Sequence, residues 1–112
     1  MKEEKNALLG ALTIYKIFVQ MESARISNDE LNSILKHIET YEDYLNHDGE
    51  INDYWLKDNC SILSKAVKCA HRHLKETSPA SPDLQELNKF MIYYRIFYNQ
   101  CGGDFDKMPI SP

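Results

Sequence analysis

The chain of 112 residues is poor in glycine and has no surplus of basic residues. Its four glycines form no glycine-rich loop, which argues against a backbone cradle for nucleotide phosphates. The 17 acidic residues outnumber the 13 basic ones and give a formal net charge of −4. Because nucleic-acid binding depends on a surplus of lysine and arginine, we expect no nucleic-acid partner. One side of a predicted helix is nevertheless basic, through Lys57, Lys65, Lys68, Arg72 and Lys75.

Long apolar runs are also missing. A membrane-spanning helix needs about 20 apolar residues in a row, and the most apolar stretch, 8–21, is interrupted by Lys16. The first residues include two acids and no cleavage site follows them, so we expect neither a membrane span nor a secretory signal peptide. Cys60 and Cys69 lie on one predicted helix at a separation of roughly 13 Å, which is too far for a disulfide. Reduced thiols of this kind are typical of a cytoplasmic protein, which is the location we expect.

The spacings that mark metal and catalytic sites are absent from the sequence. It contains no Cys-x-x-Cys or His-Glu-x-x-His motif, and none of its four histidines follows a glutamate by three residues, as di-iron bundles require. Cys69 and His73 lie one helical turn apart and could supply two zinc ligands, but a buried thiol beside a histidine is the simpler interpretation. We therefore expect no metal, no cofactor and no catalytic residue, and we do not expect an enzyme.

Apolar residues in the first half of the chain recur at the spacing of two amphipathic helices. The first helix, over about 2–24, is so apolar in its middle that it needs packing partners on more than one side. The second, over 28–46, begins at Ser27 and Glu30, which have the form of a capping box. We expect this helix to stop at 46–49, where Gly49 can adopt the left-handed conformation of a C-terminal cap.

The second half of the chain predicts two more helices, over 53–76 and 82–101. Ser81 followed by proline is a strong start signal for the last one. Four amphipathic helices joined by short loops predict an all-α fold, an antiparallel four-helix bundle over 1–103. Beyond it, we expect 104–112 to form a flexible C-terminal tail. The third helix carries a regular apolar seam of Leu56, Cys60, Leu63, Val67, Ala70 and Leu74.

The end of the second predicted helix and the turn after it are strongly acidic. A solvated loop is the simpler explanation for such a cluster. Alternatively, the acids could form a docking site for a protein with a basic surface, because complementary charge speeds association. The residues that would bind such a partner are Glu42, Asp43, Asp48 and Glu50.

The last predicted helix has apolar residues on two sides. Its core side is centred on Leu87 and Tyr98. A monomer rarely exposes several large apolar residues together, and such groups often mark interfaces. The helix could instead lie centrally in the bundle, or the tail could fold back over it. The residues on the second side, which we predict to bind a partner or a second copy of the chain, are Ile92, Tyr93 and Ile96.

These features together favour a non-enzymatic protein-binding module over other classes of function. By analogy of size and shape alone, a small inhibitor, an immunity protein or an adaptor fits best, with homodimerisation as the simplest use of the exposed residues. The alternative is a bundle that binds a small ligand in a core pocket, because buried tyrosines need partners for their hydroxyl groups. That pocket would be lined by Tyr15, Tyr94, Tyr98 and His73.

Overall fold

The computed structural model describes residues 2–22, 24–100 and 102–108. Over these residues the chain is all-helical and contains no strand, which confirms the predicted class. The predicted starts at residues 28, 53 and 82 are confirmed as well. The elements are α1 (Lys2–Met21), α2 (Asn28–Asn46), α3 (Asp53–Asp58), α4 (Cys60–Thr77), α5 (Pro82–Gln100) and a 3-10 turn, η1 (Phe105–Lys107).

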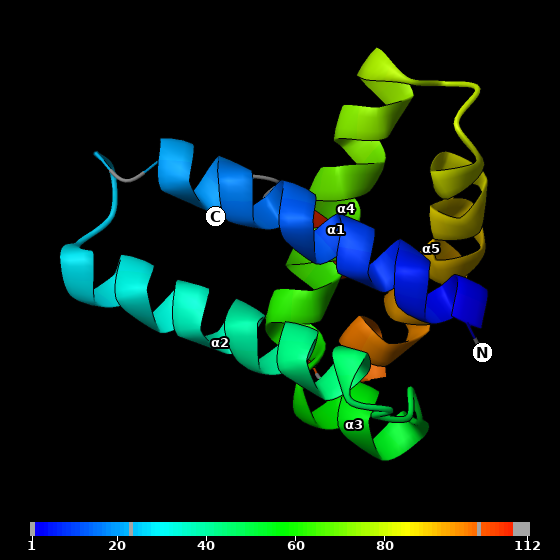
Figure 1. Ribbon diagram of the computed structural model, residues 1–112, viewed down its shortest axis with the longest axis horizontal. Coiled ribbons are helices and arrows are strands. Elements are labelled where there is room, and N and C mark those ends of the chain that lie inside the picture. Colours follow the sequence, from blue (N-terminus) through cyan, green and yellow to red (C-terminus); the bar gives the residue numbers. More distant parts are fainter. Residues whose placement is uncertain (1, 23, 101, 109–112) are drawn as a thin grey trace.

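The helices form two antiparallel hairpins, α1 with α2 and α4 with α5 (Figure 1). The hairpins cross at a steep angle instead of running side by side, so the predicted antiparallel four-helix bundle is not confirmed. Short loops force neighbouring helices to run antiparallel within a hairpin. The angle between hairpins depends on how side chains interlock across the contact, and the apolar spacing of the sequence does not specify it.

Helix α1 lies at the centre of the fold and packs against α2, α4 and α5. Its buried side includes Leu8, Leu12, Tyr15 and Val19, none of which is more than 1% exposed. A helix with three neighbours needs a wide apolar arc, which explains the unusually apolar composition of this stretch.

The third predicted helix, 53–76, is divided in two at Asn59. The Asn59 side-chain amide donates a hydrogen bond to the backbone carbonyl of Trp55 (2.8 Å), where it competes with the regular helical donor. Figure 1 shows that α3 consequently crosses the end of α4 at an angle. The apolar seam still continues through the break, because Leu56 and Cys60 on either side of it are both buried.

The first residues of the tail are packed against the helices, in contrast to the flexible tail predicted for 104–112. Phe105 is 1% exposed and Met108 is also buried. The Lys68 ammonium group donates hydrogen bonds to the backbone carbonyls of Phe105 (2.6 Å), Asp106 (3.3 Å) and Met108 (3.0 Å). A cation that meets three carbonyl oxygens fixes the path of the backbone there. Residues 109–112 lie outside the described part of the chain.

Candidate protein interface

Four of the six large apolar side chains that are exposed among the described residues lie on α3 and α5. On α5, Ile92 is 67% exposed, Tyr93 40% and Ile96 51%. On α3, Tyr54 is 85% exposed, and it lines the same hollow as Tyr93 and Ile96. We name these four residues the α3–α5 patch.

The geometry of α5 explains why half of the patch faces outwards. Its buried side consists of Leu87, Phe90 and Tyr94, which turn towards the core at three- and four-residue spacing. At 100° per residue, Ile92 and Ile96 then fall on the other side of the helix. The predicted exposure of these residues is therefore confirmed.

The tail covers a different flank of α5. The Asn99 side-chain oxygen accepts a hydrogen bond from the Phe105 backbone N–H (3.0 Å), and the Arg95 guanidinium pairs with Asp106 (3.0 Å). The tail does fold back, as one of our alternatives expected. The described part of the tail nevertheless leaves Ile92 and Ile96 exposed.

Tyr93 is at the centre of the patch and its ring forms a wall of two hollows. The first, of about 350 Å³, lies between α3 and α5 and is also lined by Asp53 and Lys57. The Tyr93 hydroxyl donates a 2.6 Å hydrogen bond to the Asp53 carboxylate. This hydrogen bond is the main reason that the pKa of Tyr93 is raised to about 12, since ionisation would place a second negative charge beside the carboxylate.

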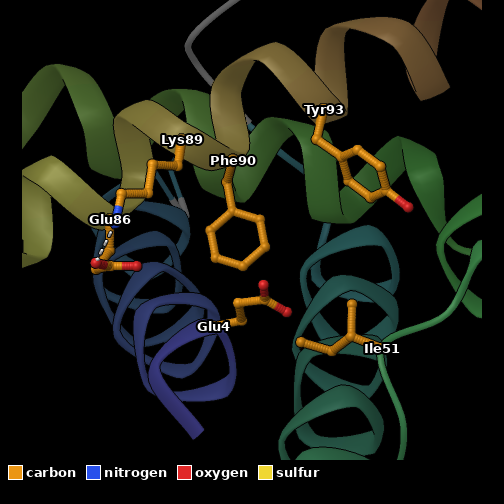
Figure 2. Close-up of a pocket in the computed structure, with 6 residues that line it drawn as sticks. All are labelled: Glu4, Ile51, Glu86, Lys89, Phe90 and Tyr93. Atoms are coloured by element: carbon orange, nitrogen blue, oxygen red, sulfur yellow. Dashed lines mark hydrogen bonds and ion pairs between the residues drawn. The ribbon is translucent and has the colours of Figure 1, made fainter. Parts of the chain in front are cut away.

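The second hollow, of about 380 Å³, brings together three segments that are distant in sequence (Figure 2). Its apolar walls are Phe90 and Tyr93 of α5 and Ile51 from the turn between α2 and α3. Its polar wall contains two carboxylates and an ammonium group. These belong to Glu4 of α1 and to Glu86 and Lys89 of α5.

The predicted acidic residues differ in their surroundings. Glu42 forms a 2.6 Å ion pair with Lys16 of α1, so its charge is partly neutralised within the chain. Asp43, Asp48 and Glu50 are exposed. Glu50 directly precedes Ile51, and Ile51 lines the second hollow together with Tyr93 of the patch.

The turn itself differs from the prediction at Gly49. Asp48 adopts the left-handed conformation (φ 64°), and Gly49 does not. Aspartate is one of the few other residues that tolerates this conformation. Gly49 is needed for space instead, because a β-carbon there would collide with the backbone oxygen and the ring of Tyr44.

The four residues of the alternative core pocket differ in their surroundings. Tyr15 and Tyr94 are both buried, and burial raises the pKa of each, that of Tyr15 to about 12. Tyr98 packs edge-on against Phe105, and His73 packs in the same way against Phe18. Neither hollow described above is lined by any of the four.

The structure also shows the surroundings of the candidate zinc ligand Cys69 and of two residues on the basic side of the third predicted helix. Cys69 is buried and burial raises the pKa of its thiol to about 11, which disfavours the thiolate that binds metal. Within the described residues, no three histidine, cysteine or acidic side chains are grouped so that they could hold a metal ion. Lys68 is used by the tail, and Arg72 pairs with Glu76. None of the described helices combines the length and apolar character needed to cross a bilayer.

Two parts of this surface were missed by the sequence analysis. The exposure of Tyr54 could have been found, because it lies two residues before the buried Leu56 and so on the opposite side of its helix. The second hollow could not have been found, since it depends on the crossing of the hairpins, which brings Glu4 close to Phe90.

Known proteins offer no assignment for this surface. No family model matches the chain, and neither a curated protein nor a solved structure matches it. The candidate interface is therefore defined by the chain's own residues, above all by the α3–α5 patch and the two hollows beside Tyr93.

Proposed function

We propose that the chain is a non-enzymatic protein-binding module, a small inhibitor, immunity or adaptor protein, that binds its partner through the α3–α5 patch. The observation that carries this proposal is the exposure of four large apolar side chains, with Tyr93 at their centre. Tyrosine is enriched among the residues that dominate binding energy at interfaces. Fully burying an isoleucine side chain stabilises a complex by about 1.5–3 kcal/mol, so Ile92 and Ile96 offer a substantial gain.

The patch is also held on helices instead of loops, which favours binding. Three of its residues lie on α5, a helix of 19 residues that packs against α4. Residues on a packed helix lose little backbone entropy when a partner binds. The fourth, Tyr54, lies on α3, which Asn52 caps by accepting a hydrogen bond from the Trp55 N–H (3.0 Å).

A second copy of the chain is the simplest partner for this patch. In a two-fold dimer the same surface meets itself, so α5 of one protomer would lie against α5 of the other. Charges of both signs surround the patch, including Asp53 and Lys57. A two-fold arrangement can therefore bring opposite charges together at the rim.

Light scattering coupled to size exclusion tests this proposal at micromolar concentration. We expect a dimer for the wild type and a monomer for Ile96→Glu, because a carboxylate would have to be buried in the contact. Ile17→Glu is the matched control, since Ile17 is on α1 and is 53% exposed, close to the 51% of Ile96. The same monomer mass for all three proteins would exclude the dimer.

A different partner is tested by capture from a lysate with the same three proteins. A protein retained by the wild type and by Ile17→Glu, but lost with Ile96→Glu, would support the patch as the binding surface. Retention by all three would show that binding uses another surface. If neither experiment gives a patch-dependent complex, the proposed function is wrong.

One observation favours the alternative, a ligand within the core. The hydroxyl group of Tyr94 is fully buried and has no hydrogen-bond partner among the described residues. Burying a hydroxyl without a partner costs free energy, which a polar ligand beside it would recover. A thermal-shift screen against a metabolite panel tests this, and a ligand whose stabilisation disappears in Tyr94→Phe would support it.

A further inference from the structure

We propose that the second hollow, the one lined by Glu4, Ile51, Glu86, Lys89, Phe90 and Tyr93, receives the guanidinium group of an arginine from a basic partner protein. This inference rests on the proposed function, because it supplies the polar anchor next to the apolar patch. Tyr93 connects the hollow and the patch, because it belongs to the patch and its ring also lines the hollow.

The shape of the hollow suits a flat cation at the end of an apolar stem. Figure 2 shows the Glu4 carboxylate beside Ile51, with the ring of Phe90 above Glu4 and the ring of Tyr93 above Ile51. A guanidinium group stacks on aromatic faces and pairs with a carboxylate through two parallel hydrogen bonds. The methylene groups of an arginine would meanwhile contact Ile51, as such stems commonly cover apolar surface.

The charges around the hollow favour a cation over an anion. Two carboxylates face one ammonium group, and that ammonium, on Lys89, already pairs with Glu86 at 3.0 Å. Glu4 forms no ion pair with any of the described residues, so its carboxylate is available to an incoming group. An anionic ligand would have to approach Glu4 and displace Glu86 from Lys89.

The hydrogen bond between Tyr93 and Asp53 adds to this preference. A phenol that donates to a carboxylate becomes richer in electron density, and the face of an electron-rich ring attracts cations more strongly. Phe90 is held in place from behind by Tyr94, whose ring centroid is 5.8 Å away. The two aromatic walls are thus fixed before a partner arrives, which lowers the entropic cost of binding.

The inference is tested by NMR titration of the full chain with Nα-acetyl-arginine amide, which presents one guanidinium group. The citrulline analogue has nearly the same shape without the charge and serves as the ligand control. We expect saturable shifts at the amides of Glu4, Ile51 and Tyr93 with millimolar affinity, and none with citrulline. Shifts spread evenly over all acidic surfaces, or identical effects of both compounds, would overturn the inference.

Two variants sharpen the result. Glu4→Gln keeps the shape of the side chain and removes its charge, and it should weaken arginine binding about fivefold, as the loss of one exposed charge pair implies. Glu39→Gln, at an exposed position on α2, is the matched control and should leave the affinity unchanged. Tyr93→Leu should also weaken binding while the thermal unfolding midpoint shows that the chain still folds. Equal affinities for all the variants would overturn the inference.

Failure of this inference is distinguishable from failure of the proposed function. A complex that depends on Ile96 but forms unchanged with Glu4→Gln would leave the patch intact and remove only the arginine site. Saturable arginine binding without any complex that depends on Ile96 would keep the hollow as a cation site and remove the patch as an interface.

Discussion

The two flanks of α5 differ in what covers them. On one flank, Arg95 and Asn99 hold the tail, so that Phe105 is only 1% exposed. On the other flank, Ile92 and Ile96 are 67% and 51% exposed. Both flanks carry apolar groups, yet only the first is covered by the tail, which the polar side chains of Arg95 and Asn99 anchor.

The bare flank lacks the contacts that hold the tail on the covered flank. A short segment covers apolar surface stably only when its backbone groups find partners, and Lys68 provides three hydrogen bonds of this kind on the covered flank. On the bare flank the polar groups beside Tyr93 are set around open hollows instead. This arrangement supports the proposal that another molecule completes this surface.

The largest expected difference between the flanks is in stability. Phe105→Ala should lower the free energy of unfolding by about 3–5 kcal/mol, because it removes a buried ring and leaves a cavity. In the monomer, Ile96→Ala should change it by less than about 0.5 kcal/mol, as is usual for an exposed residue, so both variants are compared at a concentration below that of dimer formation. Urea denaturation of both variants measures the contrast. Similar losses for the two would show that the bare flank is packed in solution.

A smaller effect is expected from the polar anchor of the tail. Lys68→Met keeps the apolar stem and removes the ammonium group, so it should lower the free energy of unfolding by about 2 kcal/mol. It should also make the tail more sensitive to trypsin at Lys107. Lys36→Met, at an exposed position on α2, is the control. If the two variants are cut and unfold alike, Lys68 does not hold the tail.

Substitutions at two neighbouring tyrosines should change the free energy of unfolding in opposite directions. Tyr94→Phe should raise the free energy of unfolding by about 1 kcal/mol, because it removes a buried hydroxyl group that has no hydrogen-bond partner in the described part of the chain. Tyr93→Phe should lower it by less than about 1 kcal/mol, since it breaks an exposed hydrogen bond to Asp53. Thermal or urea unfolding measures both. Destabilisation by Tyr94→Phe would indicate that its hydroxyl has a partner after all.

The smallest expected effect is a dependence on pH. The pKa of Tyr93 is raised from 10.0 to about 12 in the folded chain, so its contribution to stability is complete below about pH 10 and is lost as the pH rises towards 12. The free energy of unfolding of Tyr93→Phe should therefore approach that of the wild type as the pH rises from about 10 to 12. A difference that stays constant between pH 9 and pH 12 would contradict the role of the hydrogen bond to Asp53.

Much of the local structure could be predicted from the sequence, because local signals determine it. Ser27 accepts a hydrogen bond from the Glu30 N–H (3.1 Å), as its capping pattern predicts, and Pro82 begins α5. The apolar spacing of α5 likewise predicts the exposure of Ile92 and Ile96. In each case the deciding contacts lie within a few residues along the chain.

Features that depend on contacts between distant segments could not be predicted in this way. The crossing angle of the hairpins follows from side-chain packing between α1 and α4. The packing of the tail depends on Lys68, which the sequence indicates only as one of several basic residues on a helix. The second hollow depends on both the crossing and the turn at Ile51, so it appears only in three dimensions.

The shortness of α3 has a consequence for how the patch meets a partner. A helix of six residues is unstable by itself, and the hydrogen bond from Tyr93 to Asp53 is one of the contacts that hold it beside α5. Leu56, which is fully buried, and Trp55, which stacks on Tyr44, hold the same helix from within the fold. The position of Tyr54 in the proposed interface is therefore set by tertiary contacts of α3, not by helix formation in that segment alone.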